Sequence, residues 1–481
     1  MRCYYITVAS FYVQNFGCRA TQADGAAIER QFEEQGLERT GDPADAEIVV
    51  LNTCTVTAAA DQDARAAIRR LHRANPQARI VVTGCYAQRS PDELAELPGV
   101  AQVIGNSHKH QLAEIAVSLP AEMEDTQQPP LATTGAFLPL SALTENREPR
   151  NEKSIYVSDI FAHTELIATP VFDAANERTR PNLKVQDGCD NRCSFCVIPF
   201  VRGQSRSLKL EDVLREVNTL VESGYRELVI SGINLGRWGR DFSPATDDLR
   251  LTTLVCAILE RTTLEKLRIS SVEPMDWSDE LISLVENSPR IAKHAHVPMQ
   301  SGSDAVLRRM HRKYRPWHYR EKIEKIHAAM PAAAVGADVM VGFPGETDAE
   351  FEETRGMVES LPFTYLHVFT YSARPGTPAA HMPNHVPAPV ARERNRVLRE
   401  LSMNKKRAFM CSFIGKRVRA ITLREDDCAA NENSGRPVTT EALTDNYLKL
   451  RLVGQHKPNQ WVQVDVLSLE DDTLVGTLNS Q

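Results

Sequence analysis

The middle third of the chain repeats one pattern six times: a strand-like run, then a polar or glycine-rich loop, then a helical stretch. The expected strands cover residues 183–185, 228–230, 267–270, 295–297, 337–341 and 366–370. A single glycine-rich loop is weak evidence, since most such glycines only make turns. Six loops in the same position predict an incomplete, TIM-like α/β barrel whose chemistry lies at the carboxyl ends of its strands.

The loop after the first of these runs holds three cysteines, Cys189, Cys193 and Cys196, at C-x3-C-x2-C spacing. Three thiolates on one loop can hold three irons of a cuboidal cluster, and because such clusters normally take four ligands, one iron stays open. The alternative is a structural zinc site, which needs a fourth Cys or His nearby. The nearest later cysteine is Cys256 and the nearest histidine upstream is His163, so we favour the cluster.

The N-terminal third alternates strands and helices, which predicts a parallel α/β sheet. Strands are expected at 6–9, 48–51, 80–82 and 100–104, with helices at 22–35 and 58–74. Each of the first three strands is followed by a cysteine, namely Cys18, Cys54 and Cys85. Residues beyond the carboxyl ends of parallel strands meet in one crevice, so we predict a second cluster site there. The alternative is that these cysteines are small buried hydrophobic residues, the usual role of a lone cysteine.

The C-terminal segment changes character, because short strand-like runs alternate with polar turns. Five strands are expected at 417–423, 437–443, 447–453, 461–467 and 473–478. They predict a small β-barrel of the OB-like type, an architecture often used on nucleic acid. The segment 119–153 is rich in Pro, Thr and acidic residues and is interpreted as linker. The chain therefore divides into a cluster domain (1–118), a linker (119–174), a barrel (175–408) and a small β-barrel (409–481).

Composition favours a protein of the reducing cytoplasm. The chain has 481 residues, of which 42% are hydrophobic and 25% charged, and it shows neither a signal-peptide pattern nor a membrane-length apolar run. Its ten cysteines are therefore better explained by metal binding than by disulfides. The net charge of −7 is an objection to a nucleic-acid partner, but residues 302–325 and 392–419 are locally basic. Within the second of these runs, Lys405, Lys406 and Arg407 are predicted to contact phosphates.

The cysteine loop, with Phe195 just before its last cysteine, resembles the radical S-adenosylmethionine superfamily. Nearly the whole chain resembles the methylthiotransferase family of these enzymes, which combines an N-terminal cluster domain, a radical barrel and a C-terminal TRAM domain. The resemblance implies two 4Fe-4S clusters and S-adenosylmethionine as cofactors. It assigns one cluster to Cys189, Cys193 and Cys196, and the auxiliary cluster to Cys18, Cys54 and Cys85. It also places Phe195, Gly232, Glu273, Gln300 and Gly342 around S-adenosylmethionine, with no side chain acting as an acid–base catalyst.

Within the family, the branch acting on threonylcarbamoyladenosine in tRNA is the most similar. The similarity lies in Asn52-Thr-Cys-Thr-Val-Thr, Val82-Thr-Gly-Cys-Tyr-Ala-Gln and Leu183-Lys-Val-Gln-Asp-Gly-Cys, although Thr21 stands where relatives usually carry Asn. The resemblance implies that one S-adenosylmethionine methylates a sulfur at the auxiliary cluster. A second molecule gives the radical that activates C2 of the adenine at position 37. The implied partners are the tRNA anticodon stem-loop and a reducing electron donor, with no membrane and a monomeric enzyme.

Two alternatives remain open at this stage. Sister branches of the family act on isopentenyladenosine in tRNA or on an aspartate of a ribosomal protein. A different class is a non-catalytic iron–sulfur protein that binds RNA or transfers electrons, which would need the cysteines but not the rim motifs at Gly232, Glu273 and Gly342.

Overall fold

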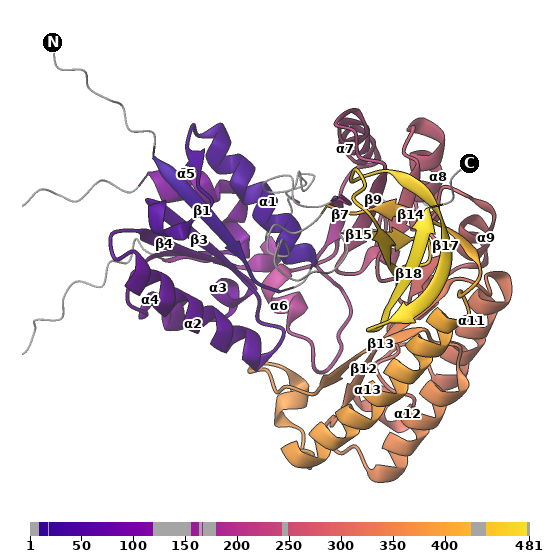
Figure 1. The fold of residues 1–481 in the computed structure, drawn as a ribbon. Coiled ribbons are helices and arrows are strands. Elements are labelled where there is room, and N and C mark those ends of the chain that lie inside the picture. Colours follow the sequence, from indigo (N-terminus) through magenta and orange to yellow (C-terminus); the bar gives the residue numbers. More distant parts are fainter. Residues whose placement is uncertain are drawn as a thin grey trace, which may run out of the picture.

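The computed structural model describes residues 9–17, 19–118, 155–162, 166, 179–242, 249–424 and 439–478. Its N-terminal part is a parallel sheet with the strand order β2-β1-β3-β4-β5-β6 (Figure 1). The strands are β1 (Ser10–Asn15), β2 (Glu38–Arg39), β3 (Ile48–Thr53), β4 (Arg79–Gly84), β5 (Val100–Gly105) and β6 (Ile155–Tyr156). Because β6 comes from the segment expected to be linker, part of that segment completes the sheet.

The first strand differs from its prediction. It spans Ser10–Asn15, whereas the sequence suggested 6–9, of which residues 6–8 lie outside the described residues. The prediction followed the more apolar run. The strand is instead made by the alternating run that follows, in which Phe11 and Val13 are buried and lie on one face.

Helices cover both faces of this sheet. Successive side chains along a strand point to opposite faces, so each face carries apolar side chains that the helices bury. The helices are α1 (Arg19–Glu34), α2 (Ala58–Ala74), α3 (Cys85–Arg89), α4 (Pro91–Ala95) and α5 (Leu112–Val117). Val49 and Leu51 of β3 pack with α2, α3 and α4, whereas Ile48 and Val50 pack with α1 and α5. Helix α2 has the predicted bounds, and Thr57 begins it by accepting a hydrogen bond from the backbone N–H of Ala60 at 3.2 Å.

The middle of the chain forms an open wall of six parallel strands, as predicted. One sheet has the order β10-β9-β7-β8 and another the order β11-β12-β13, and parallel bridges such as Ser271–His296 join them. The parallel strands are β7 (Asn182–Asp187), β9 (Glu227–Gly232), β10 (Lys266–Ile269), β11 (His294–His296), β12 (Ala334–Val341) and β13 (Tyr365–Thr370). The short β8 (Arg206–Ser207) pairs antiparallel with β7.

The two faces of this wall differ in polarity. Leu183, Leu267 and Val339 belong to the large apolar core beneath the helices. Residues one position away along the strands, such as Lys184 and Asp338, therefore face the lumen. The helices are α6 (Ile198–Arg202), α7 (Leu210–Glu222), α8 (Leu251–Arg261), α9 (Asp279–Asn287), α10 (Asp304–Arg309), α11 (Pro316–Ala329), α12 (Asp348–Ser360) and α13 (Ala388–Cys411). Of the helices in the described ranges, none combines the length and the apolar character that crossing a bilayer requires.

The C-terminal residues close into a five-stranded barrel of order β14-β15-β16-β18-β17, which confirms the predicted small β-barrel. Its strands are β14 (Arg417–Thr422), β15 (Thr439–Thr444), β16 (Lys449–Val453), β17 (Trp461–Glu470) and β18 (Thr473–Leu478). Helix α13 leads into it, and Met410 at the end of that helix lies in the barrel's own core. Figure 1 shows this small barrel, in yellow, beside the strands of the larger one.

A buried network of charges joins the N-terminal sheet domain to the barrel. Asp24 of α1 accepts hydrogen bonds from Lys109 at 3.0 Å, from Arg202 at 2.9 Å and from Lys184. Lys184 and Arg202 also bind Asp187, at 2.9 and 3.0 Å. Burial would raise the pKa of Asp24, but the three surrounding cations hold it well below its usual range. The network therefore fixes α1 against the first barrel strand.

Candidate functional site

The first cysteine loop follows β7 and is held in a defined shape by its backbone. Gly188 has φ 70° and a Cβ there would lie 1.8 Å from the carbonyl oxygen of Gln204, so this position requires glycine. The Cys189 N–H donates to the carbonyl of Gly203 at 3.1 Å, and the Cys196 N–H donates to the carbonyl of Cys193 at 3.1 Å. The three sulfurs therefore sit on one short, ordered loop at the carboxyl end of the first barrel strand.

The surroundings of these sulfurs suit metal ligands. All three cysteines are free and partly exposed. Burial raises the pKa of Cys189, and it raises the pKa of Cys196 to about 12, so burial disfavours the thiolate that a bound cation such as iron would stabilise. Donors already point at the sulfurs: the Arg312 guanidinium lies 3.2 Å from Cys193 Sγ, and the Asn234 amide lies 3.6 Å from Cys189 Sγ.

Several predicted rim residues lie around this loop. Glu273, after β10, forms an ion pair with Arg312, which brings its carboxylate next to Cys193. Gly232 ends β9, and Asn234 in the loop that follows contacts Cys189. Phe195 packs edge-on against Phe343 at a centroid distance of 6.3 Å.

Two further rim positions adopt left-handed backbone conformations. Gln300 has φ 63°, and its segment pairs with Val339 of β12. Gly342 has φ 75°, and its N–H donates to the Glu346 carboxylate at 2.5 Å. Arg394 in turn holds Glu346 at 2.8 Å. Both loops are thereby fixed at the carboxyl end of the barrel, where the sequence placed them.

The second set of cysteines lies at the carboxyl edge of the N-terminal sheet. Cys54 and Cys85 are buried, and each directly follows one member of the register pair Thr53–Gly84. Cys18 lies outside the described residues. Its neighbour Gly17 is described, and a Cβ there would come within 2.9 Å of Cys54 Sγ. The backbone just before Cys18 therefore touches Cys54.

The two cysteine regions are joined by the helix that follows the first loop. Helix α6 begins two residues after Cys196. Val197, just before the helix, and Val201 within it pack against Cys85. Asn106 donates to the carbonyl of Val201 at 2.7 Å and lies 3.6 Å from Cys85 Sγ. The carboxyl edge of the sheet therefore faces the cysteine-bearing rim of the barrel.

Two residues of the basic runs that were predicted to contact phosphates have protein partners in the structure. Arg312 lies in the basic run 302–325, which we interpreted as a phosphate-binding surface, yet it binds Glu273 and contacts Cys193. Lys405 was expected to meet phosphates, but its Nζ donates to the carbonyls of Glu359 and Leu361 at 2.8 and 2.9 Å. Lys405 therefore satisfies open carbonyls at the end of α12.

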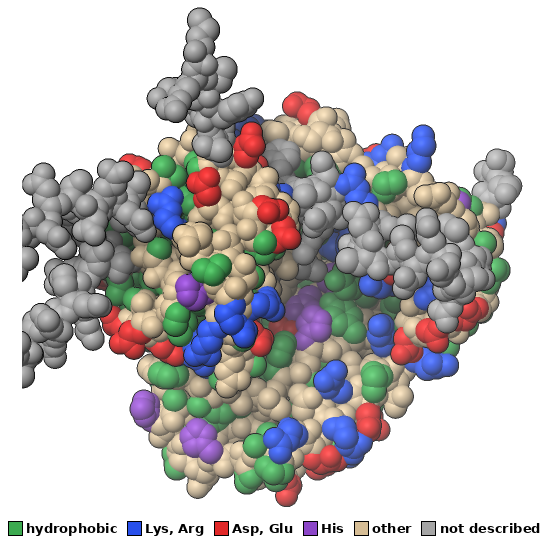
Figure 2. Space-filling view, turned by 60° about the vertical axis from the view of Figure 1, so that its left-hand side comes forward, with side chains coloured by type: hydrophobic (Ala, Val, Ile, Leu, Met, Phe, Trp, Pro, Cys, Tyr) green, Lys and Arg blue, Asp and Glu red, His purple; other side chains and the backbone are tan. Residues whose placement is uncertain are grey.

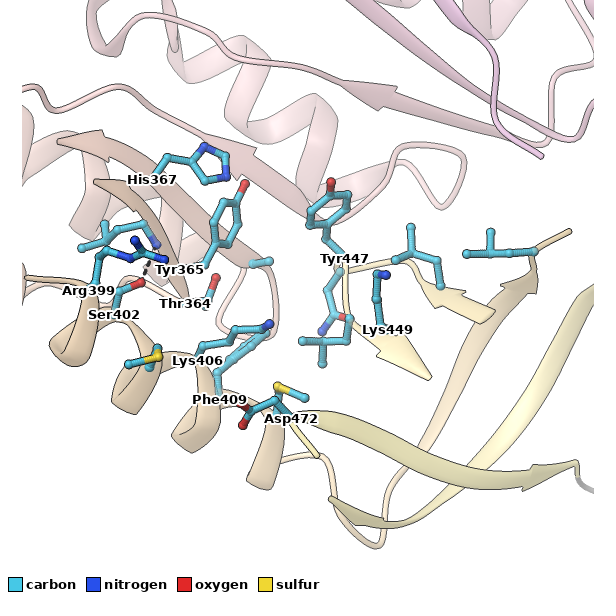
Figure 3. A pocket seen from close by; sticks show the side chains of 18 of the residues that line it. Thr364, Tyr365, His367, Arg399, Ser402, Lys406, Phe409, Tyr447, Lys449 and Asp472 are labelled. Atoms are coloured by element: carbon cyan, nitrogen blue, oxygen red, sulfur yellow. Dashed lines mark hydrogen bonds between the residues drawn. The ribbon is translucent and has the colours of Figure 1, made fainter. Parts of the chain in front are cut away.

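A pocket of about 430 Å³ lies where β13, α13 and the small barrel meet (Figure 3). Tyr365 of β13 and Tyr447 of the small barrel line it, with ring centroids 6.0 Å apart. Arg399 and Lys406 of α13 and Lys449 of β16 add positive charge to its wall. The pocket thus combines aromatic faces with cations, the groups that bind single-stranded nucleic acid.

Comparison with known proteins agrees with this architecture. Residues 10–105 match the uncharacterized protein family UPF0004, and residues 183–358 match the Radical SAM superfamily. A threonylcarbamoyladenosine tRNA methylthiotransferase MtaB from Aquifex aeolicus is 34% identical, over 94% of this chain and 98% of its own length. One from Bacillus subtilis is 35% identical, over 93% of this chain and 91% of its own length. The chain belongs to the radical S-adenosylmethionine methylthiotransferase family.

A sister activity also occurs among relatives of this methylthiotransferase. A tRNA-2-methylthio-N(6)-dimethylallyladenosine synthase from Novosphingobium aromaticivorans is 33% identical, over 85% of both chains. The radical S-adenosylmethionine methyltransferase TsrM from Kitasatospora setae shares the fold, with a TM-score of 0.54 at 16% identity, over 77% of this chain and 75% of that one.

Family membership makes the protein an enzyme that uses S-adenosylmethionine and 4Fe-4S clusters. The non-catalytic interpretation is therefore set aside.

Proposed function

We propose that this methylthiotransferase adds a methylthio group to C2 of threonylcarbamoyladenosine, next to the anticodon of tRNA. The observation that carries the proposal is the match to relatives named for that activity, at 34 and 35% identity over more than nine-tenths of the chain. The relative named for dimethylallyladenosine is 33% identical but covers a smaller share, 85%, which makes that activity the second candidate.

The cysteine sets are proposed to hold different clusters. Cys189, Cys193 and Cys196 would hold the cluster with the open iron, and Cys18, Cys54 and Cys85 the auxiliary cluster. With the open-iron cluster and S-adenosylmethionine bound, this site supplies a carbon-centred radical able to attack an aromatic C–H bond. Cys54 and Cys85 lie on the edge of the sheet that faces the cysteine loop of the barrel, with α6 between the two, and this placement supports the division.

The chain's own residues then have positioning roles. The Arg312 guanidinium contacts both Cys193 and Glu273, so it offsets the charge of a thiolate while it aims the carboxylate across the rim. Asn234 donates toward Cys189, which stabilises a thiolate there as well. We propose that Phe195, Gly232, Glu273, Gln300 and Gly342 surround S-adenosylmethionine, which the arrangement of their loops supports.

The anticodon stem-loop is proposed to dock across the junction of barrel and TRAM domain. The aromatic and basic pocket between Tyr365, Tyr447 and Lys406 supports this, because bases stack on aromatic rings while phosphates pair with cations. The domain bounds 1–118, 175–408 and 409–481 remain our proposal, as do a monomeric state, an external electron donor and a cytoplasmic location.

The test is a substrate comparison with the purified, reconstituted enzyme. We expect it to methylthiolate an anticodon stem-loop that carries threonylcarbamoyladenosine, and to leave the dimethylallyladenosine stem-loop and the ribosomal protein unmodified. Activity on dimethylallyladenosine alone would transfer the assignment to that branch. Activity on the ribosomal protein alone would overturn a tRNA substrate.

A further inference from the structure

Three metal-ligating side chains meet inside the barrel: His296 of β11, Asp338 of β12 and His367 of β13. Their ligand atoms all lie within 4.8 Å of one another. Asp338 is the register partner of His367, and His296 is the partner of Gly336 on the same strand as Asp338. Because residues 336 and 338 face the same side of a strand, all three side chains point into the lumen.

The spacing of each imidazole nitrogen from the shared carboxylate oxygen fits a common cation. His296 Nε2 lies 3.3 Å from Asp338 Oδ1, and His367 Nδ1 lies 3.2 Å from the same oxygen. Two ligand atoms bound to one ion at about 2.1 Å, with angles of about 90–110°, stand about 3.0–3.4 Å apart. Both nitrogen–oxygen distances fall within that range.

The state of His296 favours a ligand over a simple hydrogen-bond network. The residue is buried, at 8% exposure, and its Nε2 makes no hydrogen bond to any described residue despite the close carboxylate. A buried imidazole nitrogen without an aligned hydrogen bond is unfavourable unless something else satisfies it. A metal ion at the centre of the three groups would do so.

The site is rigid on one side and open on the other. The strands fix the three backbones, and the His296 ring lies against the Tyr365 ring at a centroid distance of 6.0 Å. The side chain of His367 is 56% exposed and lines the pocket of about 430 Å³ described above. Figure 3 shows His367 and Tyr365 together at one end of that pocket. Figure 2 shows histidine side chains in a hollow of the face that it displays, with Lys and Arg side chains nearby.

We propose that His296, Asp338 and His367 bind one divalent first-row transition-metal ion, with open coordination positions that face the pocket. Two imidazoles and one carboxylate suit zinc or ferrous iron, and such triads keep positions for oxygen ligands. The open positions accept water or an oxygen atom of a molecule bound in the pocket. This ion is separate from both clusters, because its ligands are nitrogen and oxygen rather than sulfur.

Zinc content measured on the full-length holoenzyme tests this site. Wild type, Asp338→Asn, His367→Gln and the control His294→Gln are each equilibrated with excess Zn²⁺, passed through a desalting column and analysed for zinc and iron. Zinc is the probe because such sites bind it more tightly than Fe²⁺, and because it is counted separately from cluster iron. His294 is a matched control, since it lies on the same strand, faces the same lumen and is equally buried at 7%. Zinc held by cysteines is common to all four proteins and cancels in the comparison.

We expect wild type and His294→Gln to carry about one zinc per chain more than Asp338→Asn and His367→Gln, with equal iron in all four. Zn²⁺ should also raise the melting temperature of wild type more than that of the two triad variants, because an ion that binds only the folded state stabilises it. Equal zinc in wild type and His367→Gln would overturn the proposal and leave a hydrogen-bonded triad. His367→Gln keeps the test decisive if Asp338→Asn folds poorly, because residue 367 lies at an exposed edge.

Discussion

Replacing Asp24 with asparagine should loosen the junction between the N-terminal domain and the barrel. The Asp24 side chain is 3% exposed and ion-paired with Lys109, Lys184 and Arg202. Removing its charge leaves three buried cations with only Asp187 as a remaining carboxylate in the network. Breaking a buried ion pair by removing one partner costs about 3–5 kcal/mol. A tenfold change in an equilibrium corresponds to about 1.4 kcal/mol, so the junction should open about 100- to 4000-fold more often.

The consequence for function follows from where the network lies. Helix α1, which holds Asp24, begins directly after Cys18. Arg202 ends the helix that begins after Cys196, so the Asp24–Arg202 ion pair joins a segment next to one cysteine set to a segment next to the other. Asp24→Asn should therefore lower methylthio transfer more than it lowers cleavage of S-adenosylmethionine. Hydrogen exchange followed by mass spectrometry should show faster exchange at α1 and β7.

The matched control is Glu34→Gln in the same helix. Glu34 pairs with Arg30 at 2.9 Å, but both side chains are more than half exposed, so its loss should cost at most about 0.5 kcal/mol. Equal changes in hydrogen exchange and turnover for Asp24→Asn and Glu34→Gln would refute this role of Asp24.

Three further predictions concern the clusters, acid stability and tRNA binding. Cys193→Ala should abolish formation of 5′-deoxyadenosine, whereas Cys54→Ala should keep some of it and stop sulfur insertion; full methylthiolation by Cys54→Ala would refute the auxiliary assignment. The pKa of Asp24 is depressed in the folded state, so its stabilising effect should persist at pH values above about 4, the pKa of an aspartate in the unfolded chain, and fade as the pH falls further. The denaturant midpoints of wild type and Asp24→Asn should therefore converge only in acid. Lys406→Ala should weaken tRNA binding and flatten the slope of log affinity against log salt by about 0.7. Lys405→Ala should leave that slope unchanged, because Lys405 binds carbonyls at the end of α12. Equal slopes for both variants would place the RNA elsewhere.

Much of the fold could be predicted from the sequence because it is set by local pattern. The apolar run 48–51 is continuous and buried on both faces, and in 337–341 the buried Ala337, Val339 and Val341 alternate with less buried residues, so both strands were found. The first strand was misplaced, since two apolar runs adjoin there and only the sheet decides which one pairs. The rule that ligands lie beyond the carboxyl ends of parallel strands placed Cys54 and Cys85 correctly on one edge.

The electrostatic part of the site could not be predicted in this way. Arg312 contacts a cysteine far away in sequence, and nothing in its own neighbourhood distinguishes it from other members of a basic run. His296, Asp338 and His367 meet only because β11, β12 and β13 pair in one register. Such clusters depend on strand register and on loop lengths, which the sequence pattern leaves open.

The central claim is the modification of threonylcarbamoyladenosine, and nucleoside mass spectrometry tests it most directly. In tRNA from cells that lack this protein, the account predicts loss of the methylthio form and accumulation of unmodified threonylcarbamoyladenosine. Wild-type protein should restore the methylthio nucleoside, whereas Cys193→Ala should not. An unchanged level of 2-methylthio-threonylcarbamoyladenosine in those cells, with loss of the dimethylallyladenosine derivative instead, would contradict the account.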